Sequence, residues 1–235
     1  MLIIGHRGAA GTHPENTLGS IDAAIAAGVD WVEIDVRGVD SGLIVLHDER
    51  LERTTNGNGS VYDLTLAELR QLDAGDGERI PLLPEVLDRI DARCGLNIEI
   101  KQADIAPALA AVLQAVLRAR PAWRGKLIVS SFLEEPLQEF ARLKPDGVEL
   151  AALSDHNSVE AQVFALAIGA TALNVSLAEL SAHVVATAHR CGLRLLVYTV
   201  NETHDIERCH RLGVDGIFTD YPARAIAFLR EQPRI

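Results

Sequence analysis

Acidic and basic side chains occupy alternate positions in two short apolar runs of the sequence. The first run contains Glu33 and Asp35, and the second contains Glu99 and Lys101. Residues i and i+2 of a strand face the same side, so each pair should project from one face of its strand. Buried charges are costly without partners, and Glu–Lys pairing would account for two of them. One lysine cannot balance three carboxylates, so the pattern favours a cation site over a purely structural network of charges.

The candidate ligands are all carboxylate oxygens. Hard divalent cations prefer oxygen ligands, whereas zinc commonly takes nitrogen and sulfur. We therefore expect one divalent cation, Mg²⁺ or Ca²⁺, at Glu33, Asp35 and Glu99, and the ligand types do not choose between the two ions. The three cysteines show no C-x-x-C spacing, so neither a zinc ribbon nor a disulfide framework is indicated.

Two histidines differ from the rest because each ends a short strand-like run. His6 follows the N-terminal run Leu2–Ile4 and precedes Arg7, and His47 ends a second run. Two histidines can act as base and acid near neutral pH, and an arginine fork fits phosphate oxygens. The other histidines are expected to be surface or structural residues: His13, His156, His183, His189, His204 and His210.

The hydrophobic pattern alternates between strand and helix periods along the whole chain. Strand-length apolar runs occur at 2–4, 31–36, 96–100, 127–129, 147–151, 172–175, 194–199 and 216–219. Helical patterns occur at 17–27, 84–93, 105–120, 134–143, 158–168, 177–191, 203–212 and 222–231. Such βα alternation predicts a parallel sheet, and this number of units fits a TIM-like (β/α)8 barrel. An open doubly wound sheet is the alternative, but the turn after the first strand lacks dinucleotide-binding glycine spacing.

The chain is expected to be a single domain, 1–235, with one departure from the βα rhythm. Residues 47–81 are rich in turn formers and follow the second strand, where they would form an insertion on the catalytic face of a barrel. In a barrel this face lies at the carboxyl ends of the strands, where both pairs of charged side chains also lie. The insertion is therefore expected to be functional.

Composition limits the possible partners and location. Lys and Arg total 22 against 33 Asp and Glu, a net charge of −11, which argues against nucleic acid or an anionic membrane as a partner. The first residues are typical of a strand and not of a signal peptide, and no apolar stretch reaches the length of a bilayer span. We expect a cytoplasmic protein with reduced thiols and no stable membrane association.

These residues, taken in order, resemble the glycerophosphodiester phosphodiesterases, and most closely the bacterial cytoplasmic members without a large inserted domain. The resemblance runs over essentially the whole chain and rests on many short motifs. The motifs are His6-Arg-Gly, Pro14-Glu-Asn-Thr17, Glu33-Ile-Asp35, His47-Asp48, Arg53-Thr-Thr-Asn-Gly57, Leu72-Asp-Ala-Gly75, Ile98-Glu-Ile-Lys101, Ser130-Ser-Phe132, Tyr198-Thr-Val-Asn201, Gly213-Val-Asp-Gly216 and Thr219-Asp-Tyr-Pro222.

The resemblance implies roles for individual residues. It makes Glu33, Asp35 and Glu99 the metal ligands and His6 and His47 the catalytic acid–base pair. Arg7 and Lys101 would bind the phosphate, with Glu15 and Asn16 supporting the first loop and the metal site, and Tyr198 would stand in the substrate wall where tryptophan is frequent.

The implied reaction is metal-dependent hydrolysis of small soluble glycerophosphodiesters to sn-glycerol 3-phosphate and an alcohol. Two alternatives remain open at this point. One is a metal-dependent barrel isomerase or lyase in which Lys101 is the base. The other is a barrel that binds phosphodiesters without catalysis, although such a protein should have lost a catalytic residue and this chain retains all of them.

Overall fold

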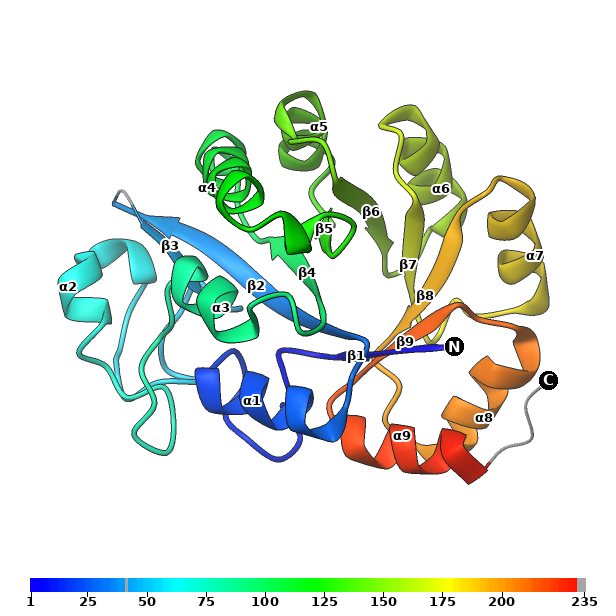
Figure 1. Ribbon diagram of the computed structural model, residues 1–235, viewed down its shortest axis with the longest axis horizontal. Coiled ribbons are helices and arrows are strands. Elements are labelled where there is room, and N and C mark those ends of the chain that lie inside the picture. Colours follow the sequence, from blue (N-terminus) through cyan, green and yellow to red (C-terminus); the bar gives the residue numbers. More distant parts are fainter. Residues whose placement is uncertain (41, 232–235) are drawn as a thin grey trace.

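A closed ring of parallel strands lies at the centre of the protein (Figure 1). The structure is a computed structural model that describes residues 1–40 and 42–231. The parallel strands are β1 (Leu2–Gly5), β2 (Trp31–Val39), β4 (Gly95–Ile100), β5 (Leu127–Ser131), β6 (Val148–Ser154), β7 (Ala172–Ser176), β8 (Arg194–Tyr198) and β9 (Gly216–Thr219). They follow one another around the ring, and pairing of β1 with β2 closes it. The predicted TIM-like barrel is confirmed.

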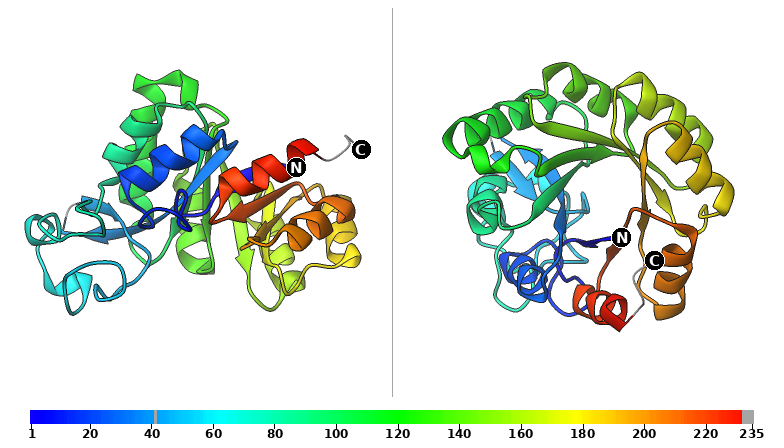
Figure 2. Two further views of the ribbon diagram at one scale, coloured as in Figure 1. Left: turned by 90° about the horizontal axis from the view of Figure 1, so that it is seen from below. Right: turned by 45° about the vertical axis from the view of Figure 1, so that its right-hand side comes forward.

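A layer of helices surrounds the ring, as the right-hand view of Figure 2 shows. These helices are α1 (Leu18–Ala27), α3 (Leu83–Ile90), α4 (Ala106–Ala119), α5 (Glu134–Leu143), α6 (Ser158–Ala167), α7 (Ala182–Arg190), α8 (Thr203–Leu212) and α9 (Pro222–Glu231). The main hydrophobic core lies between the two layers, where strand residues such as Val32, Ile34 and Ile98 are fully buried. Among the described helices, none is both long and apolar enough to cross a membrane.

One helix begins later than the hydrophobic pattern predicts. The pattern favours a start at Leu177, but α7 begins at Ala182, and Ser181 caps it by accepting a hydrogen bond from the Val184 amide. A serine at this position satisfies a backbone donor that the first helical turn leaves free. The helix therefore starts at its cap and not at the first apolar residue.

The expected insertion after the second strand is present, and it is more ordered than its turn-rich sequence suggests. It starts earlier than the predicted range 47–81, because β3 (Gly42–Val45) precedes that range and pairs antiparallel to the extended end of β2. A 3₁₀ turn at Val61–Asp63 and the short helix α2 (Leu66–Leu69) follow (Figure 1, cyan). The insertion has a hydrophobic cluster of its own, formed by Val39, Ile44, Leu46, Leu51, Val61, Leu69, Ala74 and Ile80. This cluster fixes the position of the insertion on the barrel and so fixes His47, which follows β3.

Glycines that lie shortly before a strand or at its first residue have two different structural roles. Gly28 and Gly213 end α1 and α8 in the left-handed conformation (φ 91° and 75°), which glycine adopts without steric cost. Gly95 also lies near the start of a strand but does not end a helix. It begins β4, and an added Cβ there would lie 2.2 Å from the Trp31 ring, so close packing explains the glycine.

Substituting Gly95 tests this packing. We expect Gly95→Ala to lower the free energy of unfolding by about 1–3 kcal/mol, because the methyl group overpacks the contact with Trp31. Urea unfolding of wild type, Gly95→Ala, Trp31→Leu and the double variant forms a double-mutant cycle. Gly95→Ala should cost less in the Trp31→Leu background. An equal cost in both backgrounds would show that the ring is not the reason for the glycine.

Candidate active site

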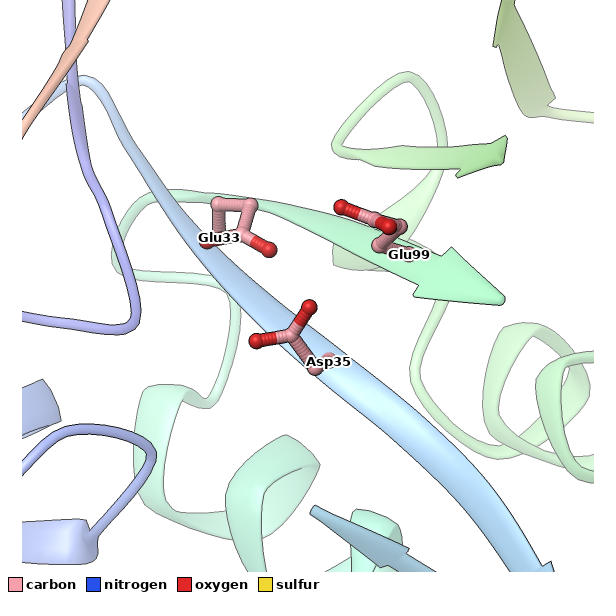
Figure 3. A group of neighbouring side chains, drawn as sticks. All are labelled: Glu33, Asp35 and Glu99. Atoms are coloured by element: carbon pink, nitrogen blue, oxygen red, sulfur yellow. The ribbon is translucent and has the colours of Figure 1, made fainter. Parts of the chain in front are cut away.

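Three buried carboxylates meet at the carboxyl ends of two neighbouring strands. Glu33 and Asp35 come from β2 and Glu99 comes from β4, where Asp35 and Glu99 are register partners. Figure 3 shows the three side chains pointing toward one another from these two strands. One oxygen of each lies within 4.8 Å of the others, and all three residues are at most 8% exposed. The arrangement predicted from alternate positions is therefore present.

Mutual repulsion and burial act strongly on these carboxyl groups. Burial, together with the charges of Asp35 and Glu99, raises the pKa of Glu33 well above its usual value. Burial and the charge of Asp35 likewise raise the pKa of Glu99 to about 7. Burial opposes the charge of Asp35 too, but Arg7 and Lys101 outweigh it and hold its pKa below the usual value. Repulsion between the carboxylates therefore destabilises the cluster, and a bound cation would reduce that repulsion.

The neighbouring cations neutralise only part of this cluster. Lys101 Nζ donates to Glu99 Oε1 at 2.7 Å, and Arg7 Nε lies 3.2 Å from Asp35 Oδ2. Lys101 Nζ is 3.6 Å from Asp35 Oδ1, which is beyond hydrogen-bond distance. The purely structural alternative, a Glu–Lys network, is thus formed in part and leaves one carboxylate charge without a partner.

Unpartnered oxygens support a metal site at this cluster. Within the described residues, Glu33 Oε1 and Asp35 Oδ1 are buried and have no hydrogen-bond partner. Leaving such atoms unpaired costs about 1–3 kcal/mol each, and more for charged groups. Oxygen atoms on two adjacent strands, with spare lone pairs and excess negative charge, suit a hard divalent cation. The residues present therefore fit the expected metal.

The loop after β1 holds Arg7 against the carboxylates. The Arg7 amide donates to Glu33 Oε2 at 2.9 Å, and Arg7 Nη1 donates to Glu15 Oε1 at 2.7 Å. Asn16 contacts Asp35 twice, since its Nδ2 donates to Asp35 Oδ2 at 2.8 Å and its Oδ1 accepts from the Asp35 amide at 3.2 Å. Glu15 thus orients Arg7, and Asn16 orients Asp35.

Each of the two predicted histidines is bonded to a carboxylate through Nδ1. His6 Nδ1 lies 2.7 Å from Asp220 Oδ1, and Asn201 Nδ2 donates to the other oxygen of Asp220 at 2.6 Å. His47 Nδ1 lies 2.5 Å from Asp48 Oδ1. With Nδ1 engaged in both rings, Nε2 is the nitrogen left for a ligand. This is the arrangement that orients an imidazole and fixes its tautomer.

A chain of ion pairs connects His47 to Arg7 across the insertion. Arg53 Nε donates to Asp48 Oδ2, and its two Nη atoms donate to the two oxygens of Glu15 at 2.7 and 2.9 Å. Glu15 in turn accepts from Arg7. The positions of His47, on the insertion, and Arg7, on the first loop, are therefore coupled through Arg53.

These groups line one cavity of about 230 Å³ at the mouth of the barrel. Its polar side contains His6, Arg7, Glu33, His47, Glu99 and Lys101. A larger hollow of about 530 Å³ lies between the first loop and the insertion, and it contains the Glu15–Arg53 pair but none of the metal carboxylates or paired histidines. The smaller cavity is the candidate active site because the reactive groups converge there.

Comparison with known proteins identifies the family. Residues 6–224 match the Glycerophosphoryl diester phosphodiesterase family. The chain is 35% identical to the glycerophosphodiester phosphodiesterase of Caldanaerobacter subterraneus subsp. tengcongensis over 98% of each chain. It is 34% identical to that of Bacillus subtilis, covering 94% of this chain and 84% of the relative. The chain therefore belongs to the glycerophosphodiester phosphodiesterase family of hydrolases.

A solved structure shares both the fold and much of the sequence. It is an Oleispira antarctica phosphodiesterase in complex with the product sn-glycerol 3-phosphate, with a TM-score of 0.88 and 30% identity, covering 98% of this chain and 97% of that one. The fold of the described residues is thus that of a phosphodiesterase barrel.

Of the ten residues that the sequence predicts for the site, nine lie at the cavity or in direct contact with its carboxylates: His6, Arg7, Asn16, Glu33, Asp35, His47, Glu99, Lys101 and Tyr198. Glu15 contacts Arg7, and Tyr198 lies on the cavity wall. The sequence analysis did not identify Asp220 and Asn201, or Arg53, which contacts Asp48 and Glu15. It also did not identify Asn97, which is the register partner of Glu33 and whose buried Oδ1 has no hydrogen-bond partner among the described residues. Asp220 and Asn201 follow β9 and β8, so their positions at strand ends were the available signal.

Metal binding can be tested without an activity assay. In the presence of EDTA, Glu33→Gln should unfold at a temperature equal to or above that of wild type, because the substitution removes repulsion within the cluster. Added Mg²⁺ or Ca²⁺ should raise the melting temperature of wild type through binding to the folded state, and should have little effect on Glu33→Gln. Glu207→Gln, on the exposed side of α8, is the charge-matched control. Equal stabilisation of all three proteins would rule out a cation at the cluster.

Proposed function

We propose that this protein hydrolyses glycerophosphodiesters to sn-glycerol 3-phosphate and an alcohol, using one divalent cation at Glu33, Asp35 and Glu99. The observation that carries the proposal is the convergence of these carboxylates, two cationic side chains and two carboxylate-bonded histidines on one cavity. Family membership supports it, as does the product bound to the Oleispira antarctica relative. We extend the proposal to small soluble diesters, a cytoplasmic location and a single barrel domain over residues 1–235.

The phosphate would lie between the carboxylate cluster and the cationic groups Arg7 and Lys101. A divalent cation held by Glu33, Asp35 and Glu99 would supply positive charge that offsets the charge developing on the phosphoryl group. Arg7 is held by Glu15 and Asp35 at its Nη1 and Nε atoms, which fixes the direction of its guanidinium fork. Prepositioned cations stabilise the charge that builds on phosphoryl oxygens without rearranging during the reaction.

Proton transfer is assigned to His6 and His47. One Nε2 accepts a proton from the glycerol 2-hydroxyl or from water, and the other donates a proton to the leaving alkoxide oxygen. If the 2-hydroxyl attacks, a cyclic phosphate forms and the two histidines exchange roles when water opens it. Asp220 and Asp48 hold the rings in place and stabilise the imidazolium that forms.

The alternative of an isomerase or lyase needs Lys101 as a neutral base. Burial disfavours the charge of Lys101, but Glu99 and Asp35 outweigh it and raise its pKa above the usual value. A lysine with a raised pKa stays protonated at neutral pH, which suits phosphate binding and not proton abstraction. The charge on Lys101 therefore favours the phosphodiesterase.

The histidine assignment predicts a large and selective loss of activity. His6→Ala and His47→Ala should each lower kcat/KM for glycerophosphocholine by about 10²–10⁴-fold, because each removes one proton-transfer group. The wild-type kcat/KM should follow a bell-shaped curve in pH. His204→Ala is the control, since that side chain is 79% exposed on α8. A comparable loss in His204→Ala, or wild-type rates in either cavity variant, would contradict the assignment.

The ion-pair chain predicts a role for Arg53, which the proposed chemistry does not use directly. Arg53→Gln should lower kcat/KM by about 10–100-fold, because His47 and Arg7 both lose a residue that orients their partners. Arg50→Gln in the same insertion is the control, because Arg50 pairs only with the exposed Glu52 among the described residues. Equal effects of the two substitutions would indicate that the Arg53 pairs are merely surface contacts.

A further inference from the structure

The two sides of the active-site cavity differ in chemistry. The side formed by β1, β2 and β4 contains the metal carboxylates, Arg7 and Lys101. The facing side, at the carboxyl ends of β5, β6 and β8, presents Phe132, Leu153, Asp155 and Tyr198, which we call the alcohol wall. Besides Glu33 and Glu99, Asp155 contributes a third carboxylate to the described lining of this cavity. The proposed mechanism uses none of the alcohol wall.

Tyr198 and Asp155 are fixed to each other. The Tyr198 hydroxyl donates to the Ser154 carbonyl at 2.7 Å and lies 2.9 Å from Asp155 Oδ1. Burial and the adjacent Asp155 carboxylate raise the pKa of Tyr198 far above its usual value, so the phenol remains a neutral donor. No hydrogen bond to Asp155 Oδ2 occurs among the described residues. That oxygen can therefore face a ligand.

Aromatic rings continue the wall toward the phosphate-binding side. The rings of Phe132 and Tyr198 pack edge to face with centroids 5.8 Å apart, and Tyr198 packs in the same way on Phe218 at 6.3 Å. The Lys101 ammonium lies 5.8 Å from the centre of the Phe132 ring. A phosphoryl group at Lys101 would therefore have its ester substituent beside these rings, with the Asp155 carboxylate further along.

A buried amide inside the cavity offers further polar atoms, independently of the wall. Asn174, on β7, is 1% exposed and lines the same cavity. Among the described residues, neither its Oδ1 nor its Nδ2 has a hydrogen-bond partner. Buried amides without partners are rare because each unpaired atom is costly. Asn174 therefore has two polar atoms available to a molecule in the cavity, whether water or a ligand.

We propose that the alcohol wall binds the leaving alcohol and selects alcohols that carry a positive charge, such as choline and ethanolamine. This inference rests on the proposed function, since it concerns the second half of the same substrate. The aromatic rings attract a quaternary or primary ammonium through their faces, and the Asp155 carboxylate supplies an opposite charge. Neutral alcohols such as glycerol gain neither interaction.

The sharpest test compares two diesters of the same shape that differ only in charge. One is glycerophosphocholine, and the other is its analogue with 3,3-dimethylbutanol, in which carbon replaces the choline nitrogen. Wild type should show a kcat/KM ratio of about fivefold or more in favour of the choline ester, measured by release of glycerol 3-phosphate. Asp155→Asn keeps the size of the side chain and should lower the ratio about twofold or more, leaving the part of the preference that the aromatic rings supply.

A remote substitution separates local recognition from the overall charge of the protein. Glu207→Gln on α8 removes the same charge far from the cavity and should keep the wild-type ratio. A wild-type ratio near one would overturn the proposal. A ratio that falls equally in Asp155→Asn and Glu207→Gln would overturn it as well, because the preference would then come from net charge alone.

Binding distinguishes failure of this inference from failure of the proposed function. If neither diester is hydrolysed in the presence of Mg²⁺ or Ca²⁺, the proposed function is wrong, and the affinity for the two diesters is measured by calorimetry. Tighter binding of glycerophosphocholine than of the analogue, by a margin that Asp155→Asn reduces, would retain the alcohol wall as a site for cationic alcohols. Equal affinities, or no binding of either compound, would overturn it.

Discussion

Repulsion among Glu33, Asp35 and Glu99 is the constraint on which the rest of the site depends. Folding places these three carboxylates within a few ångströms of one another at the buried end of two parallel strands. Arg7 and Lys101 offset part of the charge, and Asn16 orients Asp35. The negative charge that remains, together with the oxygens that have no hydrogen-bond partner among the described residues, favours binding of a divalent cation. The barrel supplies the rigidity that such a cluster needs, because each strand is held by both of its neighbours.

The insertion brings a second histidine to the cavity beside this carboxylate cluster. His6 follows the first strand of the barrel, whereas His47 follows a strand that lies outside the ring. The separate hydrophobic cluster of the insertion fixes its fold, and Arg53 connects it to the first loop through Asp48 and Glu15. Two histidines from segments far apart in the fold's connectivity, the first loop and the insertion, are thereby held at one cavity.

Two local patterns were enough to predict the fold and the carboxylate cluster from sequence. The alternation of strand and helix periods predicted the barrel, and alternation along single strands predicted the cluster. Glu33 and Asp35 had to share a face, and β2 and β4 pair in register. The carboxylate partner of His6 could not be found in this way. Asp220 is far from His6 in the chain, and only closure of the ring through β1 and β9 brings the two together. The regular structure of the insertion could not be predicted either, because its few apolar residues are dispersed among turn-forming residues and come together as a small core only in the fold.

The most direct test of the account follows the products of glycerophosphocholine with and without a divalent cation. The account predicts sn-glycerol 3-phosphate and choline as products in Mg²⁺ or Ca²⁺, no turnover after removal of the cation by EDTA, and recovery when the cation is restored. Turnover that is unaffected by EDTA would contradict a cation at Glu33, Asp35 and Glu99. Formation of glycerol and phosphocholine instead would contradict the proposed side of bond cleavage.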